Sequence, residues 1–496
     1  MPSSIIDILL LFPVILCYLC YTRWKLRGKI PVECQPPPKL PSVDPFFGLD
    51  LFKESLKISK EHKILETHAK QHDMYGKTFQ ALRLGRTTIY TVHPDNLKAI
   101  YGTNWKEWGT GRADAMETFC GRGFITRNGE EWRSHRALFA STLTEANTVN
   151  LKLLGEAYEQ YIQDLPSEGE TVDLAPIFNE LFLDLSLQFL FGKRLATLYS
   201  GDFAVDMHTF EDAFNTAQGW MGIRLAFGKI GRGVSLISKK WRESCKKVHS
   251  FVDHHITEAL EKSKVSKPEE SALSLLEKLV LRGKSKGEIR SQIIQGMLVT
   301  QDTTGIVLSN TIFLLSRHPE VWARLRKEVA GLGPFEDWSA ADLKNLKLLH
   351  NSIKESLRIY PLFHANGRVA LTKTTLPTGG GPDGKAPIFI PVGASVSTNF
   401  YKLHRDKSIF GEDIEIFNPD RWNDIFPNNW EYMPFSHGPR SCAGRHKAVG
   451  EASYIIARMA LQFEMIETRD NRTWTEDVKL VVKNGNGCQV ALCTAQ

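Results

Sequence analysis

Apolar residues recur along most of the chain with the spacing of one face of a helix. This spacing predicts helices over residues 180–190, 291–316, 339–359 and 443–463. Apolar and polar residues alternate, as they do in strands, at 87–92 and between 386 and 398, where proline and glycine interrupt the runs. The expected fold is therefore mainly α with a minor β-sheet region.

The first apolar run, residues 5–21, is long enough for one membrane-spanning helix near the minimum length. Basic residues at 23, 25, 27 and 29 follow it directly and would hold that flank in the cytosol. We therefore predict a transmembrane anchor over 1–22, with the rest of the chain facing the cytosol. A cleaved signal peptide is the alternative, but the run has neither a basic segment before it nor a clear small-residue cleavage site.

A basic and proline-rich linker is predicted over 23–49. Its six prolines between Pro31 and Pro45 favour an extended conformation and cannot propagate a helix. From residue 50 onward we find no second linker, no low-complexity block and no repeat. The sequence therefore predicts one large domain over 50–496.

Composition is that of an ordinary globular protein, with 42% hydrophobic and 24% charged residues. The net charge of +6 is small for a chain of 496 residues and does not indicate nucleic-acid binding. Eight scattered cysteines do not suggest a disulfide framework and favour a reducing compartment. Cys17 and Cys20 form a Cys-x-x-Cys pair, but they lie in the apolar run, where a thiolate is costly, so we interpret them as packing residues.

One cysteine near the C-terminus lies in a glycine-rich loop, Phe435-Ser-His-Gly-Pro-Arg-Ser-Cys-Ala-Gly444, directly before a predicted helix. Glycines allow tight turns and let a flat cofactor approach the backbone. Backbone N–H groups at a helix start direct positive charge at the Cys442 sulfur and favour its thiolate. The loop therefore predicts a metal-binding thiolate. A buried free cysteine in a turn is the alternative.

Phe435, Gly438, Arg440, Cys442 and Gly444 fill the pattern Phe-x-x-Gly-x-Arg-x-Cys-x-Gly. This pattern resembles the haem-ligand loop of the cytochrome P-450 monooxygenases. The resemblance implies the cytochrome P-450 fold and a haem b cofactor, with the Cys442 thiolate as the axial ligand of the iron. In that family the thiolate donates electron density that favours O–O cleavage.

Glu355 and Arg358 lie three residues apart on one face of the predicted helix, where they can pair. Such pairs are common, and exposed ones contribute only about 0.3–0.5 kcal/mol. The order of this pair, then Arg421 in Asn-Pro-Asp-Arg-Trp, then Cys442, is similar to the family order. That resemblance implies a buried network of three charges with a structural role.

Trp132 and Arg136 lie four residues apart, so an indole N–H and a guanidinium would share a helix face and reach one anion. The family resemblance makes that anion a haem propionate. It also makes Arg440 and Arg368 further propionate contacts. For Arg368, an ordinary surface arginine is the alternative.

The predicted helix 291–316 contains Thr300, Thr303, Thr304 and Gly305, which are unfavourable in a helix interior. Several residues with poor helix propensity, clustered in one helix, indicate a functional site. Asp302 and Thr303 match the acid–alcohol pair with which the family delivers protons during oxygen activation, so we predict that both are catalytic. An ordinary helix-surface carboxylate is the alternative for Asp302.

Val299 and Thr300 depart from the family pattern, which has a small residue and then glycine two places before the acid. Their extra bulk and hydroxyl would crowd the oxygen groove. We therefore hypothesise an altered substrate pose or reaction outcome.

Stretches along nearly the whole chain look most like fungal membrane-bound alkane and fatty-acid hydroxylases, among them 34–38 and 378–384. The resemblance implies a hydrophobic substrate, either a fungal secondary-metabolite intermediate or a long aliphatic compound. Apolar residues such as Phe119, Phe214 and Phe363 lie in the stretches expected to line the pocket, although each could equally belong to the core.

An electron donor is needed because no flavin or nicotinamide domain fits in this length. The family implies electrons from NADPH through a separate NADPH-cytochrome P-450 reductase. It also implies a single-pass protein of the endoplasmic reticulum membrane with a cytosolic catalytic domain. Arg445, His446 and Lys447 would guide an acidic reductase, although a solvated helix face is an equally ordinary interpretation.

Two alternatives to a monooxygenase stay open. The first is a haem-thiolate enzyme that uses or rearranges a peroxide without dioxygen, which the Asp302-Thr303 pair disfavours. The second is a non-catalytic haem-binding membrane protein, which would show no turnover with any electron donor.

Overall fold

The computed structural model describes residues 30–145, 150–166, 168–198, 207–265 and 273–494. The predicted anchor over 1–22 and the first part of the predicted linker lie outside the described residues, so they stay predictions. The chain divides into two compact units, one of 1–54, 68–109 and 366–399 and the other of 55–67, 110–365 and 400–496. The expected single domain over 50–496 likewise stays a prediction.

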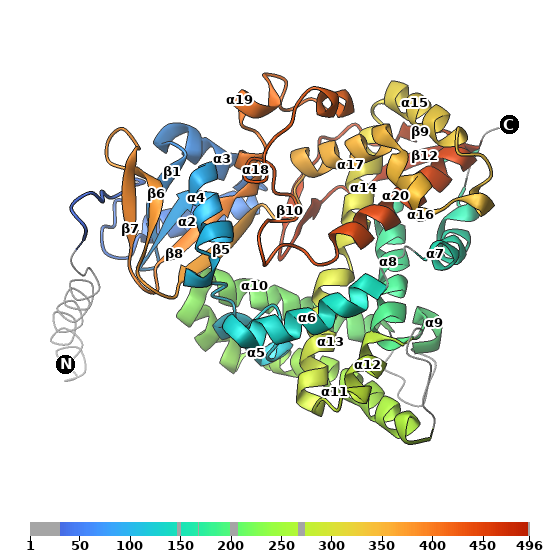
Figure 1. The fold of residues 1–496 in the computed structure, drawn as a ribbon, viewed down its shortest axis with the longest axis horizontal. Coiled ribbons are helices and arrows are strands. Elements are labelled where there is room, and N and C mark those ends of the chain that lie inside the picture. The colour runs from blue at the N-terminus through green and yellow to red at the C-terminus, as the bar shows by residue number, and fades with distance from the viewer. Residues whose placement is uncertain (1–29, 146–149, 167, 199–206, 266–272, 495–496) are drawn as a thin grey trace, which may run out of the picture. The chain divides into compact units, whose positions relative to one another are not determined.

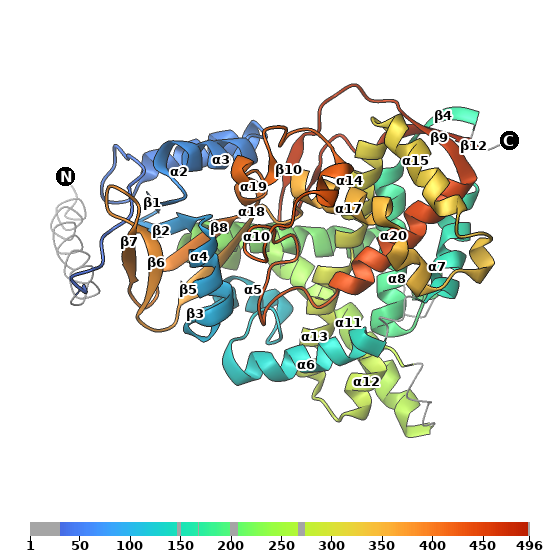
Figure 2. The ribbon, with the colours of Figure 1, turned by 45° about the horizontal axis from the view of Figure 1, so that its top comes forward.

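The first unit is built on a five-stranded sheet of order β1-β2-β8-β5-β3. Its strands are β1 (Thr78–Arg83), β2 (Arg86–Thr91), β3 (Trp108–Gly109), β5 (Ala365–Ala370) and β8 (Ser395–Asn399), and a separate antiparallel pair is formed by β6 (Thr374–Gly380) and β7 (Ala386–Ile390). β2 pairs in parallel with β8 from far along the chain, and Figure 2 shows the blue β2 beside the orange β8. The predicted strands at 87–92 and 386–398 are confirmed as β2 and as β7 with β8.

The second unit is mostly helical. Its longer helices are α6 (Gly129–Glu145), α8 (Leu174–Phe191), α10 (Met207–Ile237), α11 (Lys239–Val265), α13 (Lys286–Thr300), α14 (Thr303–Leu315), α15 (Pro319–Ala330), α17 (Lys347–Ile359) and α20 (Arg445–Gln462). Shorter ones are α5 (Ala113–Cys120), α7 (Leu151–Tyr158), α9 (Leu195–Leu198), α12 (Leu275–Leu281), α16 (Ala340–Asn345), α18 (Phe400–Leu403) and α19 (Lys407–Phe410).

The second unit also contains a three-stranded sheet, whose order is β4 (Glu168–Asp173), β12 (Gln489–Thr494) and β9 (Phe463–Thr468). A separate pair is formed by β10 (Glu476–Val478) and β11 (Val482–Asn484). The remaining described α-helices of the chain are α2 (Leu49–Lys60), α3 (Ile64–Tyr75) and α4 (Pro94–Leu97).

Three largely buried helices lie at the centre of the second unit, where the apolar helix α14 packs against both α8 and α20 (Figures 1 and 2). α8 begins where the Asp173 carboxylate accepts the N–H of Ala175, and it ends at Gly192, whose left-handed φ of 70° favours glycine. Among the described residues, α8 is the one helix long and apolar enough to cross a membrane, but most of it is buried inside this unit. We therefore interpret α8 as a core helix.

Two of the predicted helices are confirmed as single elements and two are not. Residues 180–190 lie within α8, and 443–463 correspond to α20. Residues 339–359 form α16 and α17 instead, because Leu346 turns away from helical geometry with ψ 88° and buries its side chain in the core. The Glu328 carboxylate then accepts the N–H groups that begin α17.

The predicted helix 291–316 is also divided. α13 ends at Thr300 and α14 begins at Thr303, with Asp302 between them at φ −123° and ψ −17°. Apolar residues continue the helical spacing on both sides of the break, whereas residues 300–305 are all polar or glycine, so the sequence marks this position as unusual without predicting that the helix divides. The break falls at the residues that the sequence marks as functional.

Candidate active site

The loop that carries Cys442 is a tight turn leading into α20. The Cys442 N–H donates a hydrogen bond to the Phe435 carbonyl over 2.9 Å. Ser436 and Gly438 have left-handed φ angles of 57° and 77°, a conformation that glycine tolerates and that serine adopts at a cost. Phe435 packs against the core of the second unit. The loop is therefore fixed by apolar packing on one side and by the start of α20 on the other.

The Cys442 side chain is exposed, yet burial among protein atoms raises the pKa of its thiol. The sulfur is therefore accessible although protein atoms lie close around it. The backbone N–H groups of Gly444 and Arg445 and the guanidinium groups of Arg136 and Arg445 act in the opposite direction on this pKa. The site thus directs positive charge at an accessible sulfur.

α6 brings two of the predicted residues to this loop. Arg136 donates to the Ser441 carbonyl over 2.6 Å, next to Cys442. The guanidinium of Arg440 lies 4.2 Å from the centre of the buried Trp132 ring and donates to Asn128 over 3.1 Å. Trp132, Arg136, Arg440 and Cys442 therefore gather in one place, and two guanidinium groups make it electropositive.

The break between α13 and α14 holds the predicted acid and alcohol. The Thr303 hydroxyl donates to the Val299 carbonyl over 3.0 Å, and the Thr300 hydroxyl donates to the Gly296 carbonyl over 3.0 Å. Burial raises the pKa of Asp302, so this carboxyl keeps its proton to higher pH than an ordinary aspartate. Asp302 is partly exposed, and its catalytic role stays a prediction.

Comparison with known proteins decides the family. A family model described as cytochrome P450 matches residues 38–490. The chain belongs to the cytochrome P450 family. Membership implies haem whose iron is held by a thiolate, and a redox partner that supplies electrons.

Several similar cytochromes P450 are fungal monooxygenases. Cytochrome P450 monooxygenase FPY7 of Fusarium mangiferae is 33% identical over 478 residues, which cover 94% of this chain and 90% of the relative. Cytochrome P450 monooxygenase himC of Aspergillus japonicus is 32% identical, with 92% and 84% covered. Cytochrome P450 52A12 of Debaryomyces hansenii is 33% identical, with 88% of each chain covered. The predicted likeness to fungal members of the family is confirmed. The predicted enzyme class, a cytochrome P450 monooxygenase, is confirmed as well.

The residues around Cys442 fit a haem. The sulfur is accessible, and soft thiolate is a donor that haem iron accepts. A Cβ atom placed at Gly444 would meet no described atom within 4 Å, so this glycine leaves open space beside the loop. Arg136, Arg440 and the Trp132 indole offer the cations and the apolar surface that a flat dianionic group requires.

Arg368, on β5, belongs to the first unit, whereas Cys442 belongs to the second. It is buried, with its guanidinium 4.6 Å from the centre of the Tyr101 ring and a 2.8 Å hydrogen bond to Asn366. Arg368 is therefore not a surface arginine. Its contact with a propionate stays a prediction.

The expected network of three charges is confirmed in this cytochrome P450. Glu355 accepts two hydrogen bonds from Arg358, at 2.8 and 2.9 Å, and one from Arg421 at 2.9 Å, and all three side chains are buried. The sequence did not reveal the role of Trp422, whose indole N–H also donates to Glu355 over 3.0 Å. The sequence also did not reveal the role of His404. Its ring nitrogen accepts the N–H of Met433 over 2.9 Å, two residues before the cysteine loop.

The apolar residues expected near the pocket do not all behave alike. Phe119 and Phe214 are fully buried, with ring centres 5.7 Å apart, and are core residues. Phe363 is 42% exposed and is free of the core. Whether any of the three lines a substrate pocket stays a prediction.

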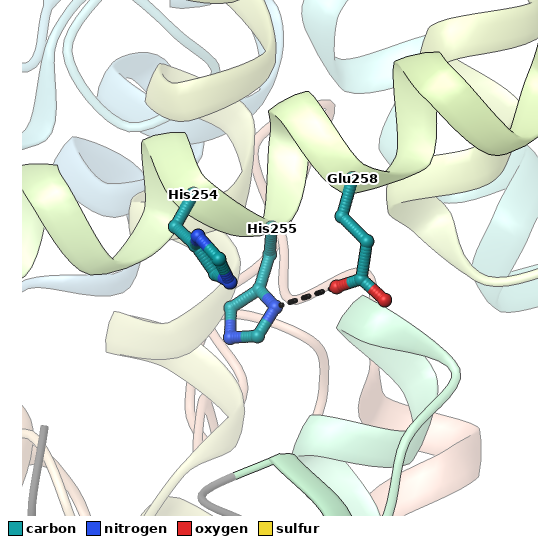
Figure 3. A group of neighbouring side chains, drawn as sticks. All are labelled: His254, His255 and Glu258. Carbon is teal, nitrogen blue, oxygen red and sulfur yellow. Dashed lines mark hydrogen bonds and ion pairs between the residues drawn. The ribbon is translucent and has the colours of Figure 1, made fainter. Parts of the chain in front are cut away.

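Away from the cysteine loop, His254, His255 and Glu258 on α11 bring three possible metal-binding atoms within 4.8 Å of one another (Figure 3). Both carboxylate oxygens already accept ammonium groups, from Lys193 over 2.7 Å and from Lys262 over 2.9 Å. Two lysines at these distances would repel a divalent cation. We therefore interpret the cluster as an ion-pair network that fastens the end of α8 to α11.

This network makes stability depend on pH. Burial and the nearby Lys193 lower the pKa of His255 to about 4. Because the unfolded chain binds this proton more readily, the free energy of unfolding falls as pH drops from about 6.5 towards 4, by about 2 kcal/mol at pH 5. Urea titrations of the holoenzyme and of His255→Asn at pH 7.5 and 5.0 measure the effect. The loss between the two pH values should be smaller in the variant, and equal losses would contradict the prediction.

Proposed function

We propose that this chain is a haem-thiolate monooxygenase that inserts one oxygen atom of dioxygen into a hydrophobic substrate, using electrons from NADPH supplied by a separate NADPH-cytochrome P450 reductase. The observation that carries the proposal is the accessible Cys442 sulfur, with backbone N–H groups and guanidinium groups directed at it, in a chain of this family. Haem b, when bound, supplies the iron at which dioxygen is activated.

Cys442 would hold the iron as a thiolate, since metal binding displaces the thiol proton. Trp132, Arg136, Arg440 and Arg368 would hold the two propionates. Phe435, Gly438 and Gly444 would shape the loop, because a larger residue at either glycine would oppose its turn or fill the open space beside it.

Asp302 and Thr303 would move protons to the reacting oxygen. The Thr303 hydroxyl already donates to the Val299 carbonyl, so its oxygen lone pairs are available to accept a hydrogen bond. The raised pKa of Asp302 lets that carboxyl carry a proton nearer neutral pH and release it through water or the neighbouring hydroxyl. Together the two side chains link a proton source to an acceptor that faces the reacting oxygen.

Thr300 should influence the outcome of the reaction. Its hydroxyl is held by the Gly296 carbonyl, so its bulk has a fixed position at the end of α13. Replacing Thr300 by glycine should change either the product distribution or the fraction of NADPH that yields product. Thr300→Ala is the control, since it removes the bulk without adding glycine flexibility. Products and coupling identical to the wild type in both variants would refute the hypothesis.

The proposed substrate class rests on the likeness to fungal members of the family. The similar proteins are fungal monooxygenases, which supports a secondary-metabolite intermediate or a long aliphatic compound as the substrate. We expect either compound to partition into lipid.

A membrane location is part of this proposal. The predicted anchor would tether the enzyme to the endoplasmic reticulum membrane as a single-pass protein with a cytosolic catalytic domain. Exposed apolar side chains in the second half of α10 support contact with lipid, among them Ile230 at 57% and Ile237 at 80% exposure. Arg445 and His446 at the start of α20 are exposed, which supports their availability to an acidic reductase.

The proposal is tested by product analysis in a host that co-expresses a reductase, offered fatty acids and natural-product intermediates in parallel. An oxygenated product that needs both this chain and the reductase is expected. Product formed with peroxide and no reductase would favour the peroxide-using alternative. No turnover with any donor would favour a non-catalytic haem protein.

A further inference from the structure

The break between α13 and α14 removes four backbone hydrogen bonds from what would be one helix. In the described chain, the N–H groups of residues 302–305 do not donate to the carbonyls of 298–301, while the bonds on either side, Gln301 to Met297 and Ile306 to Asp302, are present. Four carbonyl groups therefore lose their usual donors, and such groups need other partners when they are shielded from water.

Two hydroxyl groups take over as donors at this break. The Thr303 hydroxyl donates to the Val299 carbonyl, which is a contact within the same segment. The Ser186 hydroxyl donates to the Thr300 carbonyl over 2.7 Å and comes from another helix, α8. Ser186 is buried, so its hydroxyl is held in this interaction and does not turn to solvent.

α8 is a rigid support for the break, because it is apolar and packed into the core. It also contacts the start of α14: a Cβ atom at Gly305 would come within 3.0 Å of the Phe178 carbonyl and of the Asn179 side chain. The start of α14 therefore packs against α8 at Gly305. The end of α13 is held to the same helix by the Ser186 hydrogen bond.

We propose that Ser186 is a positioning residue that keeps the helix open at Asp302 and Thr303 by occupying the Thr300 carbonyl. Without this donor, the nearest available partner for the carbonyl is the Thr304 N–H, and that bond would restore helical geometry across the break. Asp302 and Thr303 would then rotate away from the positions that serve proton transfer. The inference rests on the proposed function.

The test compares Ser186→Ala and Ser186→Cys with the wild-type holoenzyme. Cysteine is close to serine in volume, and its thiol is a weaker hydrogen-bond donor than a hydroxyl. If the alanine variant fails to fold, the cysteine variant still tests the role of the hydrogen bond. Ser352→Ala is the matched control, because Ser352 is buried and its hydroxyl donates only to the Leu348 carbonyl of its own helix. The readouts are hydrogen peroxide released per NADPH oxidised with reductase, and amide hydrogen exchange of peptides that cover residues 299–306.

Peroxide release should rise in the order wild type, Ser186→Cys, Ser186→Ala. The expected rise for alanine is about fivefold, the population change that corresponds to one hydrogen bond of about 1 kcal/mol. Amides across the break should become better protected from exchange as the helix closes, and Ser352→Ala should match the wild type in both readouts. Peroxide yield and exchange unchanged in both Ser186 variants, or an equal response in Ser352→Ala, would overturn the inference. Failure of the wild type itself to oxidise NADPH would instead count against the proposed function.

Discussion

Replacement of Glu355 by alanine is expected to lower the free energy of unfolding by about 3–5 kcal/mol. The carboxylate is fully buried and accepts hydrogen bonds from Arg358, Arg421 and Trp422. Its removal leaves the buried Arg358 guanidinium without a countercharge and leaves Arg421 with Asp413 as its remaining carboxylate partner, which is far more costly than the loss of an exposed ion pair.

The effect should extend to the cysteine loop. Arg358 also donates to the carbonyls of His404 and Ile414, and His404 in turn accepts the N–H of Met433, two residues before the loop. We therefore expect the Glu355→Ala protein to retain less haem than the wild type after purification.

Glu412→Ala is the matched control for this prediction. Glu412 pairs with Lys407 over 2.7 Å, but its side chain is 85% exposed, so its removal should cost at most about 1 kcal/mol. The measurement is the urea midpoint and the slope of unfolding for the wild type and both variants. Equal losses at Glu355 and Glu412 would show that burial of the network does not matter.

Replacement of Thr303 by valine should lower product formed per NADPH by about 10²-fold, the lower range for loss of a proton-transfer group. Valine keeps the shape of threonine and removes the hydroxyl that we propose takes part in proton transfer. NADPH consumption should continue, with the electrons recovered as hydrogen peroxide.

Thr311→Val separates this chemistry from a general effect on α14. Thr311 is buried on the same helix, and its hydroxyl donates to the Val307 carbonyl over 2.7 Å, as that of Thr303 does to Val299. Its coupling of NADPH to product should stay at the wild-type value. If the two variants lose coupling to the same extent, or if neither loses it, the assignment of Thr303 is wrong.

Much of the site could be predicted because it depends on residues close together in the sequence. Five residues of one loop identify the cysteine, and helical spacing places Trp132 with Arg136 and Glu355 with Arg358. The alternation of apolar and polar residues likewise locates β2, β7 and β8. These features need no knowledge of distant contacts.

The rest depends on contacts that span long stretches of sequence. The polar run 300–305 marks an unusual position in residues 291–316 but does not by itself predict that the helix divides, because one of the donors that stabilises the break, Ser186, lies 114 residues before Thr300. The turn at Leu346 similarly depends on burial of its side chain and on Glu328 of α15. Hydrophobic periodicity cannot reveal such contacts, since it reports only which face of an element is apolar.

The identity of the iron ligand is tested most directly by the carbon monoxide spectrum of the reduced, fully haem-loaded protein. The wild type should give the spectrum of thiolate-ligated haem, and Cys442→Ser should lose it while other folded-state signals persist. A wild-type spectrum of imidazole or water ligation that Cys442→Ser leaves unchanged would contradict the assignment of Cys442 and everything built on it.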